Sequence, residues 1–287
     1  MLTDLEVLSF SQAGLTGTIP SELGALSKLQ FLQLAGLGSG NGAVLSGSIP
    51  TELGLLTSLT QLELSSSSLY GSIPSELGRL SNLAGLSFYT NFLSGRIPTE
   101  FGHLSNIQRL DLSWNSLSGP IPTEMGSLFH LDQLITTSNF LTGSIVTELG
   151  RLTRLTWIDM GVNSLSGSIP SFIGLISNLQ VLNMGTNALA GSIPSELGQL
   201  SNLWRFYVDT NRLTGAVPTE LGGLSNLLIT YISNNNLKGS VKGIFCPQHV
   251  FGRLEPNGIS YDFTLQADCD QVNCTCCTKC CTASSPC

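Results

Sequence analysis

The chain repeats a short pattern every 24 residues. An aliphatic residue followed by proline recurs at this interval, at Ile73-Pro74, Ile97-Pro98, Ile121-Pro122, Ile169-Pro170, Ile193-Pro194 and Val217-Pro218. Ile145-Val146 keeps the register without the proline. A fixed period of this size is typical of a solenoid, in which each repeat packs mainly against its neighbours. Such a chain is expected to present a long surface rather than a deep pocket.

Each repeat predicts a short strand followed by a tight helical turn. In one unit, Leu110 and Leu112 alternate with polar residues, which indicates a strand with one buried face. Residues 122–126 then place proline, glutamate and glycine where they suit the start, the positive end and the close of a short helix. About ten such units run from Leu5 to about Lys242, and their strands should stack into one parallel sheet. Thr136 and Thr230 occupy core strand positions, so packing should be poorer there.

An asparagine follows the strand in most units and forms a ladder at the same spacing. Its members are Asn91, Asn115, Asn139, Asn163, Asn187, Asn211 and Asn235. An amide at this position can satisfy backbone groups of its own turn and of the adjacent turn, which would otherwise be buried without partners. We therefore interpret the ladder as structural rather than as a row that binds a ligand.

Composition and charge exclude several classes of function. Only 11% of the residues are charged, and the net charge of −7 argues against binding a polyanion such as nucleic acid. No uninterrupted apolar run is long enough to predict a membrane span. The histidines are scattered, and the sequence contains no discernible nucleophile–base set or phosphate-binding glycine motif. We therefore predict a protein that is not an enzyme and that needs no cofactor or metal.

The consensus LxxLxxLxLxxNxLxGxIPxxLGxL resembles the plant-type leucine-rich repeat and covers residues 5–242. This family includes the extracellular parts of receptor kinases and polygalacturonase-inhibiting proteins. The resemblance implies an α/β repeat solenoid: a right-handed superhelix with a concave parallel sheet and short 3-10 or turn segments on its convex side. It also implies that the concave face binds a protein, a peptide or a glycan. The expected domains are a repeat array at 1–242, with an insertion near 36–43, and a cysteine-rich cap and tail at 243–287.

All eight cysteines lie in the tail, at Cys246, Cys269, Cys274, Cys276, Cys277, Cys280, Cys281 and Cys287. Such density at one end favours disulfides formed in an oxidising compartment, although the connectivity stays open. Thiolate metal binding through Cys277 and Cys280 is the alternative. Asn273 begins a glycosylation sequon, which matters only on the secretory path. We expect an extracellular or cell-surface protein, even though no signal peptide or cysteine-paired N-terminal cap is visible. Three explanations stay open: a natural product that extends further, a truncated gene model, or a partner that covers this end.

Variable outward-facing strand positions form the candidate binding surface. They are rich in aromatic, arginine and aspartate residues, the types that dominate interface energies or meet cationic ligands: Tyr89, Arg109, Asp111, Trp114, Trp157, Asp159, Arg205, Tyr207, Asp209 and Tyr231. The preferred hypothesis is rigid display of this surface in a receptor-like, adhesion or defence role. Inhibition of a cell-wall hydrolase is one alternative. Ice binding is another, because serine and threonine recur on the turn side. The sequence does not predict an oligomeric state.

Overall fold

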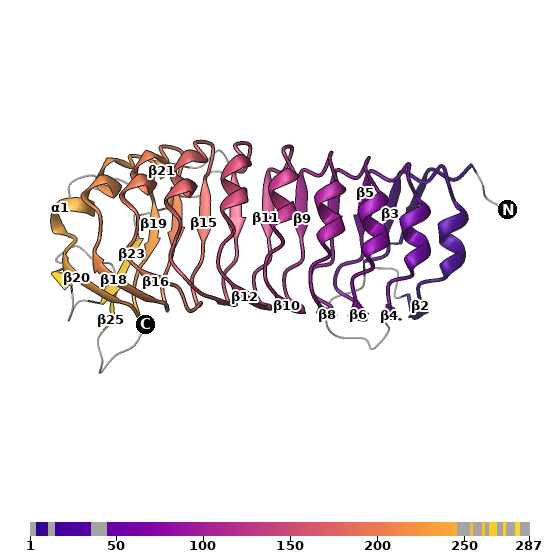
Figure 1. Ribbon diagram of the computed structural model, residues 1–287, viewed down its shortest axis with the longest axis horizontal. Helices are drawn as coiled ribbons and strands as arrows, with labels where there is room; N and C mark the ends of the chain where they lie inside the picture. Colours follow the sequence, from indigo (N-terminus) through magenta and orange to yellow (C-terminus); the bar gives the residue numbers. More distant parts are fainter. Residues whose placement is uncertain are drawn as a thin grey trace. The chain divides into compact units, whose positions relative to one another are not determined.

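The computed structural model describes residues 4–10, 15–35 and 45–245, together with the backbone of five strands beyond residue 252. The chain divides into two compact units, residues 1–142 and 143–287. Each unit is built of stacked coils, and each coil contributes a strand, a turn, a second short strand and a 3-10 helix (Figure 1). The insertion near 36–43 lies outside the described residues.

In the first unit, one short strand per coil forms a parallel sheet. Its order is β1 (Val7–Ser9), β3 (Phe31–Gln33), β5 (Gln61–Glu63), β7 (Gly85–Ser87), β9 (Arg109–Asp111) and β11 (Gln133–Ile135). The register pairs equivalent positions, such as Leu62 with Leu86 and Leu86 with Leu110. These leucines point inward and are fully buried, so successive coils share one apolar interior.

A second sheet and a row of 3-10 helices close the coils of the first unit. The second sheet contains β2 (Gly17–Thr18), β4 (Leu45–Gly47), β6 (Ser68–Ser72), β8 (Phe92–Gly95), β10 (Ser116–Gly119) and β12 (Phe140–Gly143). The helices are η1 (Ser21–Ala25), η2 (Thr51–Leu55), η3 (Ser75–Arg79), η4 (Thr99–His103) and η5 (Thr123–Ser127). A proline precedes each of them in extended conformation, and a glutamate lies in each first turn, as the sequence predicts.

The second unit repeats this plan and extends it into the tail. Its main parallel sheet is β13 (Trp157–Asp159), β15 (Val181–Asn183), β17 (Arg205–Tyr207), β19 (Ile229–Tyr231), β23 (Thr264–Asp268) and β25 (Lys279–Cys281). A smaller sheet joins β16 (Ala190–Gly191), β18 (Arg212–Ala216), β20 (Asn236–Ser240) and β24 (Val272–Asn273). Two strands of the expected cap and tail therefore add to the main sheet.

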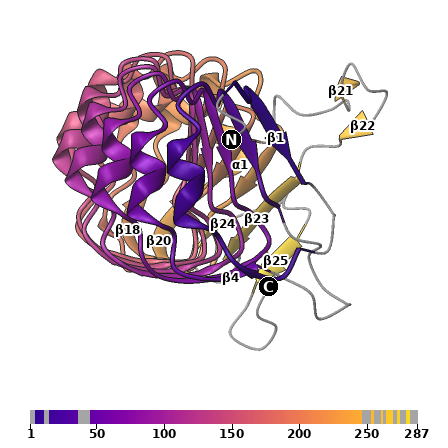
Figure 2. The ribbon, with the colours of Figure 1, turned by 90° about the vertical axis from the view of Figure 1, so that its right-hand side faces the viewer.

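The helices of the second unit are η6 (Thr147–Arg151), η7 (Ser171–Leu175), η8 (Ser195–Gln199), η9 (Thr219–Gly223) and the α-helix α1 (Lys242–Phe245). The remaining strands are β14 (Ser164–Leu165) and an antiparallel pair, β21 (Arg253–Leu254) and β22 (Ser260–Tyr261). Within each unit the main sheet and the helices lie on opposite sides of the coil, which the end-on view shows (Figure 2). The predicted fold class, a leucine-rich-repeat solenoid with a parallel sheet and 3-10 turns, is confirmed.

The asparagine ladder connects neighbouring turns in both units. In the first, Asn115 accepts a hydrogen bond from the Leu93 amide at 3.0 Å and donates to the carbonyls of Phe88 and Leu112 at 2.9 and 3.2 Å. In the second unit, the Asn211 side chain makes the equivalent hydrogen bonds. It accepts one from the Leu189 amide and donates one to the Met184 carbonyl, each at 2.9 Å. The amides thus pair backbone groups that the turns would leave unpartnered.

Candidate functional site

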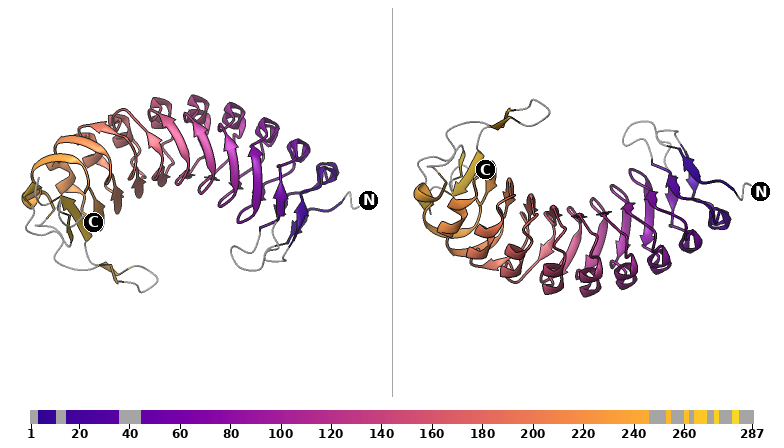
Figure 3. Two further views of the ribbon diagram at one scale, coloured as in Figure 1. Left: turned by 90° about the horizontal axis from the view of Figure 1, so that it is seen from below. Right: turned by 90° about the horizontal axis from the view of Figure 1, so that it is seen from above.

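The candidate site lies on the outer face of the main sheet in the second unit, the face turned away from the helices (Figure 3). Inward positions of β13, β15 and β17 hold the buried residues Ile158, Leu182 and Phe206. Because side chains alternate along a strand, the residues on either side of each point outward. The register aligns these outward residues into two rows. One row contains Trp157, Val181, Arg205 and Ile229, and the other contains Asp159, Asn183, Tyr207 and Tyr231.

A hollow of about 250 Å³ opens where these strands end. It is lined by Gly161, Val162, Asn183, Gly185, Thr186, Tyr207, Asp209 and Tyr231. The two glycines make room for polar side chains that line the hollow, because a Cβ atom at Gly161 would lie 2.8 Å from Asn183 Nδ2 and one at Gly185 would lie 2.7 Å from Asp209 Oδ1. Larger residues there would displace the polar side chains that line the hollow.

Hydrogen bonds fix the orientation of the side chains beside the hollow. Asn183 donates through Nδ2 to Asp159 Oδ1 at 2.9 Å, and the Gly161 amide donates to the same oxygen at 3.2 Å. Asn183 Oδ1 in turn accepts from the Gly185 amide at 3.0 Å. The polar groups are therefore held in position before any ligand arrives, which limits the entropy lost on binding.

Two tyrosines and one carboxylate line the hollow. The rings of Tyr207 and Tyr231 pack with centroids 4.8 Å apart and planes inclined at 43°. Burial raises the pKa of Asp209, which accepts a hydrogen bond from the Thr210 hydroxyl at 3.4 Å. Burial also raises the pKa of Tyr207, an effect that the nearby Arg205 opposes. A half-buried carboxylate beside aromatic rings suits a cationic or hydrogen-bond-donating group.

Buried donors without partners lie in the row next to the hollow. Trp157 Nε1 and Arg205 Nε are enclosed by protein and make no hydrogen bond within the part of the chain that the structure describes. The Arg205 guanidinium carbon lies 4.0 Å from the centroid of the Trp204 ring, a cation–π contact that anchors it. Unpaired buried donors are rare and costly in native proteins, so this face retains unused hydrogen-bonding capacity.

The turn beside the hollow contains backbone strain. Val162 and Thr186 line it, and both adopt a left-handed conformation with φ of 53°. For β-branched residues this conformation is a genuine outlier, which persists only when surrounding contacts enforce it. The ladder residues Asn163 and Asn187 follow these positions, and each donates to the carbonyl two residues before it, at 3.1 and 3.2 Å. The rim of the hollow is therefore held rigidly.

The sheet face of the first unit contains an ion pair between Arg109 and Asp111. Arg109 donates to Asp111 Oδ2 and to Gln133 Oε1, both at 2.9 Å. Asp111 also accepts from the Ser113 hydroxyl at 2.5 Å and the Ser113 amide at 3.1 Å, and it is only 5% exposed. Burial raises the pKa of Glu63 on the same face, and Arg109 opposes this increase.

The residues that the sequence grouped as one surface belong to both units. Tyr207, Asp209 and Tyr231 line the hollow, and Asp159 lies in the same row as the two tyrosines. Trp157 and Arg205 lie in the other row of the second unit. Tyr89, Arg109, Asp111 and Trp114 belong to the first unit. Trp114 lies in the turn beyond β9 with φ of 55°. Asp111 accepts a hydrogen bond from Arg109 of the same strand.

Sequence reasoning placed Asn183 among the outward-facing strand positions but left out Gly161, Val162, Gly185 and Thr186, which also line the hollow. One signal was available, because Gly161 and Gly185 occupy equivalent places in consecutive repeats, where other repeats carry larger residues such as Tyr89 and Asp209. Glycine at a strand end can mark the close approach of another group.

Several predictions concern residues about which the structure gives little or nothing. The cysteines lie outside the described residues, except Cys280 and Cys281, of which only the backbone in β25 is described. Only the backbone of Asn273, in β24, is described as well. Across residues 4–10, 15–35 and 45–245, no three His, Cys, Asp or Glu side chains come together as they would around a metal ion. None of the helices described has the length and apolarity that crossing a membrane requires.

A parallel-sheet solenoid with a rigid, polar and aromatic sheet face defines a class of repeat proteins built for recognition. Comparison with known proteins agrees with this class. The Leucine Rich Repeat family profile matches residues 58–80, 106–128 and 178–200. A search of curated proteins found no match.

Solved structures give closer comparisons. The ectodomain of the receptor kinase GASSHO1/SCHENGEN3 from Arabidopsis thaliana, in complex with CASPARIAN STRIP INTEGRITY FACTOR 2, is 40% identical with a TM-score of 0.79, over 82% of this chain and 28% of that one. The plant peptide hormone receptor RGFR1, in complex with RGF2, is 38% identical with a TM-score of 0.77. The match covers 83% of this chain and 37% of RGFR1. A plant ice-binding protein is 30% identical with a TM-score of 0.65, over 82% and 73%.

The chain belongs to the plant-type leucine-rich-repeat proteins. It spans well under half of the two receptor ectodomains, at 28% and 37% of their lengths.

Proposed function

We propose that this chain is a non-enzymatic, extracellular recognition protein that binds an extended peptide on the sheet face of its second unit. The observation that carries the proposal is the rigid hollow between Asp209 and the Tyr207–Tyr231 pair. Two of the similar receptor ectodomains were solved with CASPARIAN STRIP INTEGRITY FACTOR 2 and with RGF2, the latter bound to a peptide hormone receptor, which supports a peptide as the ligand.

The chemistry of the hollow favours a basic peptide. A lysine or arginine side chain placed there would meet the Asp209 carboxylate and the faces of the two tyrosines, and the chain's net charge of −7 would favour its approach. Neighbouring strands lie about 4.8 Å apart and an extended chain rises about 3.3 Å per residue. A peptide crossing the strands would therefore pass from Trp157 to Arg205, two strands apart, within about three residues.

The unpaired donors extend this argument to the peptide backbone. Trp157 Nε1 and Arg205 Nε need acceptors, and a peptide carbonyl would supply one to each after a rotation of the covering side chains. Pairing these donors on binding would recover part of the free energy that their burial costs, about 1–3 kcal/mol for each group. The affinity would then depend on both the main chain and one basic side chain of the ligand.

The test is selection of peptides on the immobilised full-length chain, followed by calorimetry with the synthetic peptides. Tyr207→Ala combined with Tyr231→Ala should weaken binding by about tenfold or more, since aromatic anchors dominate interface energies. Tyr89→Ala is the matched control, because Tyr89 is an exposed tyrosine of the first unit. Absence of enriched peptides, enrichment of acidic ones, or equal losses in both variants would contradict the proposal.

A second candidate, ice binding, is favoured by the similarity to the plant ice-binding protein, which this chain covers for 73% of its length. Exposed hydroxyls recur on the turn side of the second unit at Ser144, Ser168 and Ser192, until Ala216 interrupts the row. Thermal hysteresis and faceted ice crystals in solutions of the chain would support this function. Rounded crystals with no hysteresis would exclude it.

Inhibition of a cell-wall hydrolase would instead be seen directly in an activity assay.

A further inference from the structure

The second sheet of the first unit carries large aromatic rings that point into solvent. Tyr70 of β6 pairs in register with Phe92 of β8, and their exposed fractions are 58% and 62%. Phe140 of β12 pairs with Ser118 of β10 and is 61% exposed. The peptide site proposed above makes no use of these rings, because they lie in the other unit and on the other sheet.

The rest of this sheet face is uncharged and rich in hydroxyls. Strands β4, β6, β8, β10 and β12 contain only leucine, serine, threonine, tyrosine, phenylalanine and glycine. Their leucines are buried, so serine, threonine and aromatic side chains form the outer face. Ser94 and Ser118 donate only long hydrogen bonds, of 3.5 and 3.3 Å, to carbonyls of the preceding strand. These hydroxyls keep most of their hydrogen-bonding capacity for a ligand.

Two hollows run along the edge where this sheet passes into the 3-10 helices. One, of about 580 Å³, is lined by Thr18, Ser48, Glu52 and Tyr70, among others. The next, of about 640 Å³, includes Ser72, Arg96, Glu76 and Glu100. Ser48, Ile49 and Thr51 line both, so the hollows form one continuous groove.

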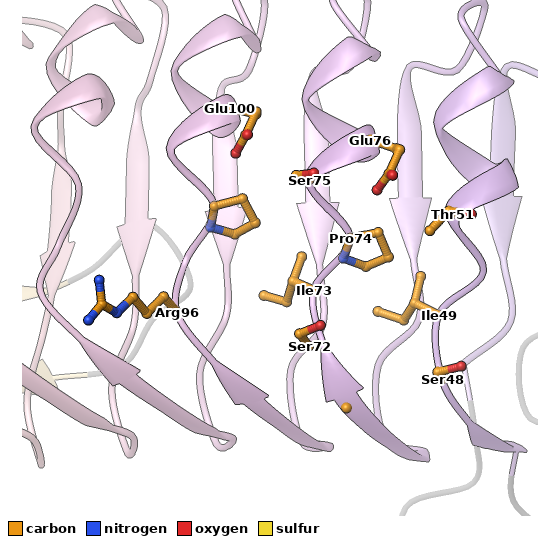
Figure 4. A pocket seen from close by; sticks show the side chains of 12 residues that line it. Ser48, Ile49, Thr51, Ser72, Ile73, Pro74, Ser75, Glu76, Arg96 and Glu100 are labelled. Atoms are coloured by element: carbon orange, nitrogen blue, oxygen red, sulfur yellow. The ribbon is translucent and has the colours of Figure 1, made fainter.

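Figure 4 shows the arrangement of the second hollow. Ser48, Ser72 and Arg96 lie on its sheet side, while Glu76 and Glu100 lie on its helix side. The groove therefore presents hydroxyl, guanidinium and carboxylate groups, and Tyr70 adds an aromatic ring to its lining. This set provides hydrogen-bond donors and acceptors together with a ring on which an apolar surface can stack.

The size of the aromatic patch argues against a second copy of the chain as the occupant. An aromatic side chain has roughly 150–250 Å² of surface, so three rings exposed by about 60% offer roughly 270–450 Å². A stable protein interface needs about 800 Å² from each partner. The third ring, Phe140, lies beside Ser118 and does not join the Tyr70–Phe92 pair in one apolar surface.

The charges of the groove argue against an acidic ligand. Glu52, Glu76 and Glu100 follow its length, and Arg96 is the single cationic residue among those that line the two hollows. An acidic polysaccharide would meet a row of like charges. A neutral sugar chain avoids this repulsion, because each of its hydroxyls can both donate to a carboxylate and accept from a guanidinium or a hydroxyl.

We propose that this groove and the adjoining Tyr70–Phe92 pair bind a neutral polysaccharide in an extended conformation. Pyranose rings stack through their apolar faces on Tyr70 and Phe92, and their hydroxyls bond to Ser48, Ser72 and the groove glutamates. The strand spacing of about 4.8 Å matches an extended polymer that repeats on the scale of one sugar ring. The site is separate from the peptide site, so one chain could attach to a glycan matrix and still capture a peptide.

The experiment titrates the full-length chain with cellohexaose, xylohexaose and laminarihexaose, with hexagalacturonate as the acidic comparison. We expect at least one neutral hexasaccharide to bind more tightly than hexagalacturonate. Tyr70→Ala combined with Phe92→Ala should weaken that binding by about tenfold. Phe129→Ala is the matched control, because Phe129 is 58% exposed but lies beyond η5, outside the second sheet and the residues that line the groove.

Each other outcome overturns the proposal. The proposal is wrong if none of the neutral hexasaccharides binds or if hexagalacturonate binds more tightly than they do. It is also wrong if the double variant and Phe129→Ala have equal effects on binding. Self-association in sedimentation that Phe92→Ala abolishes would identify a second copy as the occupant instead. The Tyr207→Ala, Tyr231→Ala variant should retain sugar binding, so failure of the peptide site and failure of this site are distinguishable.

Discussion

Asn115 offers the sharpest test of how the coils are held together. Its side chain accepts from the Leu93 amide at 3.0 Å and donates to the carbonyls of Phe88, Leu112 and Ser113 at 2.9, 3.2 and 3.1 Å. In Asn115→Ala, the carbonyls of Phe88 and Leu112 keep hydrogen bonds from Asn91 and Asn139, whereas the buried Leu93 amide loses its acceptor. An unsatisfied buried donor costs about 1–3 kcal/mol, and the other lost bonds add about 1 kcal/mol, so we expect a loss of about 2–4 kcal/mol.

The measurement is the urea midpoint of the variant beside that of Asn106→Ala. Asn106 is an exposed asparagine whose amide donates a single hydrogen bond, to the Ser81 carbonyl at 2.9 Å. Its replacement should cost no more than about 1 kcal/mol, because water can take the place of the lost group. Equal midpoints for the two variants would refute the idea that the ladder satisfies buried backbone groups.

Two further predictions concern the second unit. Thr230 is fully buried in a core strand position, and its hydroxyl has no hydrogen-bond partner among the described residues. Thr230→Val should therefore raise the free energy of unfolding by about 1–2 kcal/mol. A lower urea midpoint for the variant would show that the hydroxyl is satisfied. Burial raises the pKa of Asp209, so its contribution to stability is full below the ordinary aspartate pKa and is lost as the pH rises through the raised value. Asp209→Asn should therefore be more stable than the parent at pH 7 and lose this advantage in acid, and a difference that does not change with pH would contradict the assignment.

The fold could be predicted from the sequence because its period fixes the environment of each position. Leu110 and Leu112 face the interior for the same reason as their equivalents in every other coil, namely that stacking buries them. Thr136 and Thr230 are buried as the pattern predicts, and the ladder asparagines have the backbone partners that their spacing indicates.

The candidate site was less predictable, because it depends on contacts between neighbouring strands. Asp111 looks like an outward-facing acid in the sequence, yet Arg109 and Ser113, two residues away on either side, engage it. Gly161 and Gly185 leave room for the side chains of Asn183 and Asp209. The repeat pattern marks the two glycines, but the contacts with these neighbours follow only from the structure. The left-handed turn at Val162 could not be expected either, since a β-branched residue disfavours that conformation.

The most direct test of the proposed function is to locate the bound peptide on the chain. A photoreactive benzoylphenylalanine would replace Tyr231 in one variant and Leu175 in another, the latter being an exposed residue of η7 on the helix side of the second unit. Mass spectrometry after irradiation would then identify crosslinks to a peptide selected on the parent chain. We expect crosslinking from position 231 and none from position 175. Crosslinking from position 175 alone would place the ligand on the helix side and contradict recognition by the sheet face.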